Sequence, residues 1–103
     1  MAREDVVTME ILGTKTFCAA RTLQEQAFKV CEESFELYQA VKHLDDVNEV
    51  IDEHARRWAM IDECADVTQA ALNFFAMLGF DEDDVFDVMD ECYRRNKHRG
   101  RVE

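Results

Sequence analysis

The chain has no proline and only three glycines among its 103 residues. Tight turns depend on these two residue types, so a fold made of many short strands is disfavoured. Apolar residues make up 48% of the chain, which is sufficient for one modest hydrophobic core at this length. The sequence therefore predicts a single all-α domain.

Helical periodicity divides the chain into a leading segment and a main domain. Residues 1–21 show no clear period, and we expect a short helix or an extended arm there, followed by a main domain over residues 22–101. The main domain opens with Thr22 and Glu25, a capping-box pattern in which each side chain bonds a free amide of the first helical turn. Apolar residues at three- and four-residue steps then predict a helix over residues 23–44.

The middle of the main domain lacks helix-breaking residues. Asp46 and Glu49 resemble a second capping box, and no Gly or Pro occurs from 47 to 78. One helix of that length would be too long for a domain of this size, so we expect a break near Arg56 to Trp58.

Residues 67–80 contain no charged side chain, and their apolar residues point to all sides of a helix. Such a helix must be central, and one short chain cannot surround it, so we expect a homodimer or homotetramer. Gly79 is expected to end this helix, and Asp81 with Asp84 to cap the next one. The residues predicted on the buried face of that last helix are Val85, Val88, Met89, Cys92 and Tyr93.

The net charge of −11 argues against general binding to nucleic acids or anionic membranes, which both require Lys and Arg to neutralise phosphate. We find neither a signal-peptide pattern nor an apolar run long enough to span a bilayer, and expect a cytoplasmic protein. The four cysteines form no C-x-x-C pair and the histidines lack zinc-finger spacing to them. We therefore expect reduced, packed thiols and no structural zinc.

Two acidic clusters lie within apolar helical patterns: Glu32, Glu33 and Glu36 in the first, and Glu63 with Asp66 in the second. Residues three apart share a helix face, so two such faces opposite each other would form an oxygen-only site for Mg²⁺ or Mn²⁺. With 23 acidic residues, carboxylates spaced by three also arise by chance on solvated faces. What separates the chosen residues is their context: Glu63 and Asp66 start the most apolar helix of the chain, where a carboxylate without a compensating charge is costly. For Glu32 alone, a place on a solvated face is an equal alternative.

The order and spacing of the clusters resemble a known family. Glu32-Glu33-Ser34-Phe35-Glu36 is followed after 26 residues by Glu63-Cys64-Ala65-Asp66, and this arrangement resembles the MazG-like members of the all-α nucleoside triphosphate pyrophosphohydrolases. The resemblance covers about residues 22–101, including the LGFDEDD turn and the closing CYRRNKHRGR. It implies a four-helix-bundle-like MazG fold completed by homo-oligomerisation.

The resemblance also implies a reaction and roles for the acidic residues. The reaction is Mg²⁺-dependent hydrolysis between the α and β phosphates of a nucleoside triphosphate, which gives a monophosphate and pyrophosphate. Glu33, Glu36, Glu63 and Asp66 would ligate the metal ions. Glu32 would be a further ligand or would orient the attacking water.

Polar residues outside the clusters are candidates for substrate contacts. Arg95, Asn96, Lys97 and Arg99 match the family's Asn- and Arg-containing substrate segment, although cations also complement the dipole at a helix C-terminus. Asn73 lies seven residues after Asp66 on the same stripe and could contact a ligand carboxylate or the nucleotide; the alternative is a hydrogen-bonded core asparagine. Lys29 and His43 are assigned to the surface.

Three alternatives remain. Phosphoribosyl-ATP pyrophosphohydrolases share the KVxEE opening, but the Tyr-His segment that usually follows their second motif is absent here. A di-iron carboxylate bundle would need Glu-x-x-His pairs, and none of His43, His54 and His98 has a Glu three residues before it. A non-catalytic acidic helical binding protein would explain the charge, but not carboxylates on apolar helices.

Overall fold

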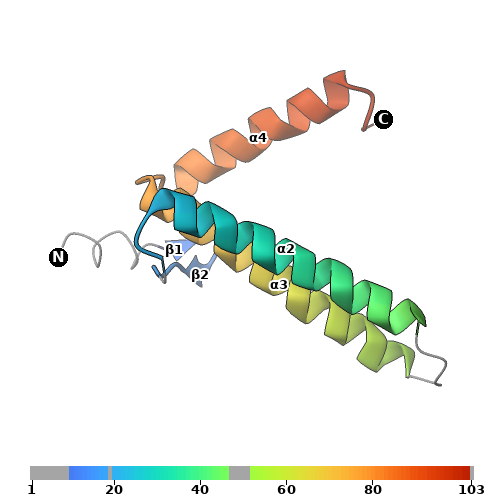
Figure 1. Cartoon of the computed structure of the whole chain (residues 1–103). Helices are drawn as coiled ribbons and strands as arrows, with labels where there is room; N and C mark the ends of the chain where they lie inside the picture. Colours follow the sequence, from blue (N-terminus) through green and yellow to red (C-terminus); the bar gives the residue numbers. More distant parts are fainter. Residues whose placement is uncertain (1–9, 19, 47–51, 103) are drawn as a thin grey trace. The chain divides into compact units, whose positions relative to one another are not determined.

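The computed structural model describes residues 10–18, 20–46 and 52–102 (Figure 1). These residues are mostly helical, in α2 (Leu23–Asp46), α3 (Glu53–Met77) and α4 (Glu82–His98), which confirms the predicted all-α class. Two short strands, β1 (Glu10–Ile11) and β2 (Thr14–Lys15), precede the helices. The chain falls into two compact units, one of Ala19–Phe74 and one of Met1–Cys18 with Phe75–Glu103.

The first unit is a hairpin of α2 and α3, which lie side by side and antiparallel (Figure 1). At the end of the hairpin where α2 begins and α3 ends, the Gln26 side-chain Nε2 donates a hydrogen bond of 2.9 Å to the Ala70 carbonyl oxygen. The seam between the helices consists of buried or half-buried residues at steps of three and four, close to the spacing of a coiled coil. On α2 these are Gln26, Val30, Glu33, Leu37, Val41 and Leu44, and on α3 they are Arg56, Met60, Glu63, Val67, Ala70 and Phe74.

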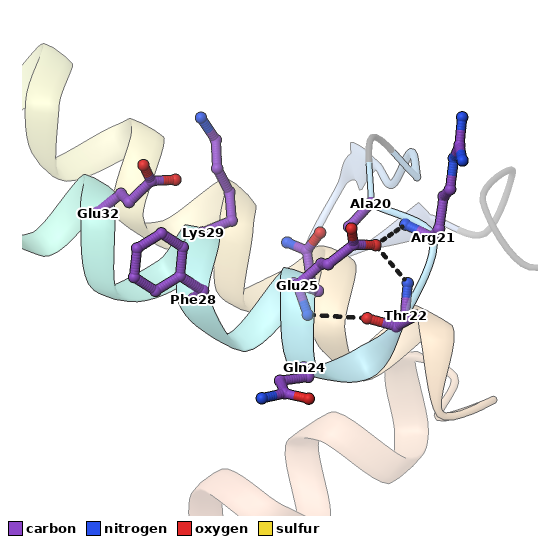
Figure 2. Close-up of a pocket in the computed structure, with 9 residues that line it drawn as sticks. Ala20, Arg21, Thr22, Gln24, Glu25, Phe28, Lys29 and Glu32 are labelled. Atoms are coloured by element: carbon purple, nitrogen blue, oxygen red, sulfur yellow. Dashed lines mark hydrogen bonds between the residues drawn. The ribbon is translucent and has the colours of Figure 1, made fainter.

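The start of α2 follows the predicted capping box (Figure 2). The Glu25 amide donates to Thr22 Oγ1 at 3.0 Å, and the Thr22 amide donates to Glu25 Oε1 at 3.0 Å. The Arg21 amide adds a third bond, to the same Glu25 oxygen, at 2.9 Å. Because these donors favour the charged carboxylate, they lower the pKa of Glu25 below its ordinary value.

The predicted break near Arg56 to Trp58 is wrong, because α3 runs through these residues without interruption. The helix begins at Glu53, where Asp52 Oδ2 accepts a hydrogen bond of 3.3 Å from the Ala55 amide. Residues 53–58 carry no Gly, Pro or turn-favouring residue, so nothing local stops the helix there. The second capping box, of Asp46 with Glu49, lies outside the described residues.

The described part of the leading segment forms a β-hairpin rather than the expected short helix or extended arm. Its two-residue turn consists of Leu12 (φ 55°) and Gly13 (φ 76°), the combination of positive φ values found in type I′ turns. Leucine rarely adopts this conformation, and its amide donates a 2.7 Å hydrogen bond to Glu82 Oε2 at the start of α4. This contact between distant residues stabilises a turn that the local sequence does not predict, and it leaves Ile11 fully buried.

The link between α3 and α4 follows the sequence closely. Gly79 adopts φ 80°, and hydrogen bonds run from its amide to the Ala76 carbonyl and from the Phe80 amide to the Phe75 carbonyl. This pair is the Schellman motif, which satisfies free carbonyls at a helix C-terminus. Asp81 then caps α4 in a reciprocal capping box with Asp84, as predicted.

Only part of the predicted buried face of α4 is buried. Val85 is 1% exposed, whereas Met89 and Tyr93 are each about half exposed. The N-terminal end of α4 is tied to the β-hairpin by the bond from the Leu12 amide to Glu82, whereas Met89 and Tyr93 lie one and two turns beyond Val85.

The four cysteines are free, but Cys31 and Cys64 are exposed rather than packed. Within the described ranges, no helix combines the length and the apolar character needed to cross a membrane.

Candidate metal centre

Three of the predicted carboxylates come together in the α2–α3 hairpin. Glu33 and Glu36 on α2 and Glu63 on α3 each contribute one oxygen, and these three oxygens lie within 4.8 Å of one another. Glu33 and Glu63 are half-buried because each occupies a seam position, while Glu36 is exposed one turn further along α2. The antiparallel pairing of the helices therefore produces the acidic cluster that the spacing of the motifs predicts.

Glu32 and Asp66 do not join this group of three. Asp66 is exposed, one turn beyond Glu63 on α3. Glu32 is also exposed and lines a hollow along the first turns of α2 with Phe28 and Lys29 (Figure 2). Both residues therefore border the cluster rather than form it.

The surroundings of Glu63, the member of the cluster on α3, disfavour its charged form. Partial burial raises the pKa of Glu63 above its ordinary value, and the negative charges of Asp66, Glu36 and Glu33 raise it further. A cation bound among these oxygens would reverse the second effect.

The donor set fits a hard divalent cation. Carboxylate oxygens are the ligands that Mg²⁺ and Mn²⁺ prefer, and opposite ligands of an octahedral Mg²⁺ lie about 4 Å apart, twice the metal–oxygen distance. Oxygens already within 4.8 Å of one another need only small side-chain adjustments to reach that geometry. Water and substrate oxygens would supply the remaining positions, as is usual for Mg²⁺.

Lys29 is the neighbour of the cluster that the sequence interpretation missed. Its Nζ lies 3.2 Å from Glu33 Oε1, and the Glu33 side chain is only 13% exposed. The bond to Glu33 raises the pKa of Lys29, with smaller contributions from the charges of Glu32 and Glu36. The four-residue step from Lys29 to Glu33 was the available signal for this contact.

Asn73 is a buried residue at a distance from the cluster. It is 3% exposed, and its Oδ1 accepts a 2.9 Å hydrogen bond from Gln69 Nε2. Ten residues separate it from Glu63, which is about 15 Å along a helix. These observations favour the core asparagine over a ligand-orienting role.

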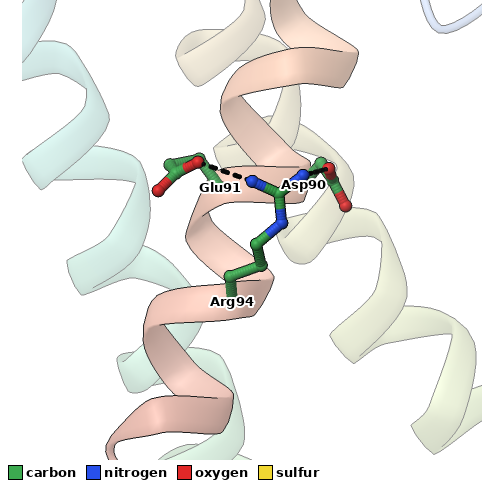
Figure 3. A network of polar contacts seen from close by, with 3 residues as sticks. All are labelled: Asp90, Glu91 and Arg94. Atoms are coloured by element: carbon green, nitrogen blue, oxygen red, sulfur yellow. Dashed lines mark hydrogen bonds and ion pairs between the residues drawn. The ribbon is translucent and has the colours of Figure 1, made fainter.

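Among the described residues near the end of α4, some polar side chains are held in local contacts and others are not. Arg94 forms ion pairs with Asp90 and Glu91 (Figure 3), and its Nη1 lies 3.0 Å from Glu91 Oε2. Asn96 is also engaged locally, since its Nδ2 donates to the Cys92 carbonyl and its Oδ1 accepts from Arg101. The exposed basic residues among the predicted substrate contacts are Arg95, Lys97 and Arg99.

No protein-family model, curated protein or solved structure matches the chain. The case for a function therefore depends on the geometry and chemistry of the acidic cluster and on the order of its motifs.

Proposed function

We propose that this chain is a Mg²⁺-dependent nucleoside triphosphate pyrophosphohydrolase, which cleaves the bond between the α and β phosphates to give a monophosphate and pyrophosphate. The observation that carries the proposal is the meeting of Glu33, Glu36 and Glu63, from two helices, within 4.8 Å. Metal sites for phosphate chemistry need this combination of several carboxylates and an open side for substrate.

Each acidic residue has a proposed role. Glu33, Glu36 and Glu63 hold the first cation, and Asp66, one turn beyond Glu63, extends the ligand set towards a second. The bound ions would neutralise phosphate charge and lower the pKa of the attacking water. Glu32 is exposed beside Glu33 and is the proposed group that orients this water and accepts its proton.

The exposed cations Arg95, Lys97 and Arg99 are the proposed phosphate-binding residues. Arginine can bond two phosphate oxygens at once, which suits a triphosphate. Asn96 was predicted with them, but its two hydrogen bonds favour a role in ending α4, where the Arg101 amide also bonds the Asn96 carbonyl.

We further propose that the hairpin of α2 and α3 pairs with a second copy to complete a four-helix, MazG-like bundle, as a dimer or within a tetramer. The support is apolar surface on both helices. Each of five large apolar residues is more than half exposed: Phe28, Phe35 and Tyr38 on α2, and Trp58 and Ile61 on α3. Large exposed apolar surface marks interaction sites in soluble proteins.

The test is to incubate the purified chain with Mg²⁺ and a panel of canonical and modified nucleoside triphosphates, and to separate the products. Monophosphate with pyrophosphate is expected, and diphosphate with phosphate would contradict the proposed bond. Glu36→Gln should abolish turnover. Asp87→Asn, which removes the same charge from an exposed position on α4, is the matched control and should retain it.

Other outcomes of the same assay identify the alternatives. Turnover of phosphoribosyl-ATP with none of the common triphosphates would favour the related histidine-pathway type of enzyme. Absence of metal-dependent turnover for every nucleotide would favour an acidic helical binding protein.

A further inference from the structure

Lys29 forms an ion pair with a member of the acidic cluster. Its Nζ lies 3.2 Å from Glu33 Oε1, at the four-residue step at which charged side chains of a helix meet. The partner is not an exposed carboxylate of a solvated face but the half-buried Glu33, one of the three residues whose oxygens converge. The ammonium group therefore lies beside the acidic cluster.

The position of Glu33 links Lys29 to the whole cluster. Lys29 Nζ is 3.2 Å from the Glu33 carboxylate, which itself lies within 4.8 Å of the Glu36 and Glu63 oxygens. Three carboxylates that lie within 4.8 Å of one another repel, and a single adjacent positive charge reduces that repulsion. The Lys29 side chain is 48% exposed, so it can leave this position without disturbing packed residues.

We infer that Lys29 is a built-in counter-cation, which balances the carboxylate cluster in the metal-free protein and is displaced when a divalent cation binds. This inference rests on the proposed metal centre, but not on the reaction. Lys29 and the metal ion would compete for the Glu33 carboxylate, and the positive charge of Lys29 would also repel the incoming ion. Lys29 thus sets the metal affinity of the site without being a ligand.

The test measures Mn²⁺ binding to the full chain by electron paramagnetic resonance, without any nucleotide. Lys29→Met removes the charge while keeping a long unbranched side chain, and should bind Mn²⁺ about fivefold to tenfold more tightly than the wild type. Lys29→Arg should restore the wild-type affinity. Lys42→Met is the control for the change in net charge, since Lys42 is exposed on the same helix and lies about 20 Å from Lys29 and about 9 Å beyond Glu36; it should change Mn²⁺ affinity less than Lys29→Met does.

Melting temperatures without metal give an independent measurement. Lys29→Met should melt below the wild type, and this difference should shrink when Glu33→Gln is present in both proteins, because the pair is then already broken. Saturating Mn²⁺ should remove the deficit of Lys29→Met in the chain with intact carboxylates.

Two results would overturn the inference. Equal or weaker Mn²⁺ binding by Lys29→Met would mean that Lys29 orients Glu33 for the metal or has no influence on it. A wild type that fails to bind Mn²⁺ would remove the metal centre itself. Failure of the proposed reaction is distinguishable from both, because it would leave Mn²⁺ binding and its Lys29 dependence intact while no nucleotide is hydrolysed.

Discussion

Gln26→Met should leave the protein as stable as the wild type or make it more stable, although it removes a buried hydrogen bond. Gln26 is 1% exposed on α2, and its Nε2 donates to the Ala70 carbonyl on α3. Its other polar atom, Oε1, is buried and has no hydrogen-bond partner among the described residues. The substitution therefore deletes one favourable and one unfavourable polar feature at once.

The magnitude follows from these two terms. Loss of the bond to Ala70 costs about 1 kcal/mol, and Ala70 keeps its place in the α3 hydrogen-bond ladder. Removal of the unpartnered Oε1 recovers about 1–3 kcal/mol, the desolvation cost of such a group. Methionine has a similar length and fills the same space, so the net effect on the free energy of unfolding is about 0 to +2 kcal/mol.

The assay is urea denaturation followed by circular dichroism, at one fixed protein concentration because association would also affect stability. Gln26→Ala is the contrasting variant: it leaves a cavity and should be about 2–5 kcal/mol less stable than Gln26→Met. Gln24→Met, at an exposed position two residues earlier, should change stability by less than about 0.5 kcal/mol. A loss of more than about 1 kcal/mol in Gln26→Met would refute the reasoning, because Oε1 would then have a favourable partner.

Three further predictions concern the helix ends and the apolar surface. The pKa of the Glu25 carboxyl in the folded state is lowered below 4.5, so the carboxylate stabilises the fold above that pH and ceases to do so as the pH falls through the folded-state value. Glu25→Gln should therefore lower the melting temperature at neutral pH. If the two proteins still differed in strong acid, the charge of Glu25 would not be the cause. Gly79→Ala should cost roughly 1–2 kcal/mol in urea denaturation, entirely from the positive φ, because an added Cβ meets nothing within 4 Å; an unchanged midpoint would show that the turn relaxes. Light scattering should give a dimer or tetramer at micromolar concentration and a smaller species for Phe35→Glu, whereas a monomeric wild type would rule out the proposed bundle.

Features set by neighbouring residues could be predicted from the sequence. The two predicted capping boxes that fall within the described residues, at Thr22 with Glu25 and at Asp81 with Asp84, form as expected. Each depends on one side chain and an amide three residues away, so no distant part of the chain is needed. The C-terminal role of Gly79 could be predicted for the same reason.

Features set by contacts between distant residues could not be predicted. The β-hairpin turn at Leu12 is supported by Glu82, seventy residues away, and nothing near Leu12 indicates it. The break at Arg56 to Trp58 was expected only because a single helix over residues 47–78 would be long for this domain. No helix-breaking residue is present there, and α3 continues through these positions. Which acidic residues converge was only partly predictable. The three-residue spacing placed Asp66 on the same helix face as Glu63, but Glu63 occupies a half-buried seam position and Asp66 is exposed beside it.

The positions of Glu33 and Glu63 argue for a function more strongly than their number does. In a seam with coiled-coil spacing these positions would ordinarily be apolar, as Val30, Leu37 and Val67 are. Carboxylates there lose hydration and repel each other, and apolar residues of similar size would favour the metal-free fold. Exposed acidic pairs elsewhere in the chain stay hydrated and do not incur this cost. A high content of Asp and Glu is enough to explain those pairs, but not Glu33 and Glu63. A cation that binds the folded hairpin and not the unfolded chain would stabilise the fold by mass action, and would offset the cost of Glu33 and Glu63 in the seam.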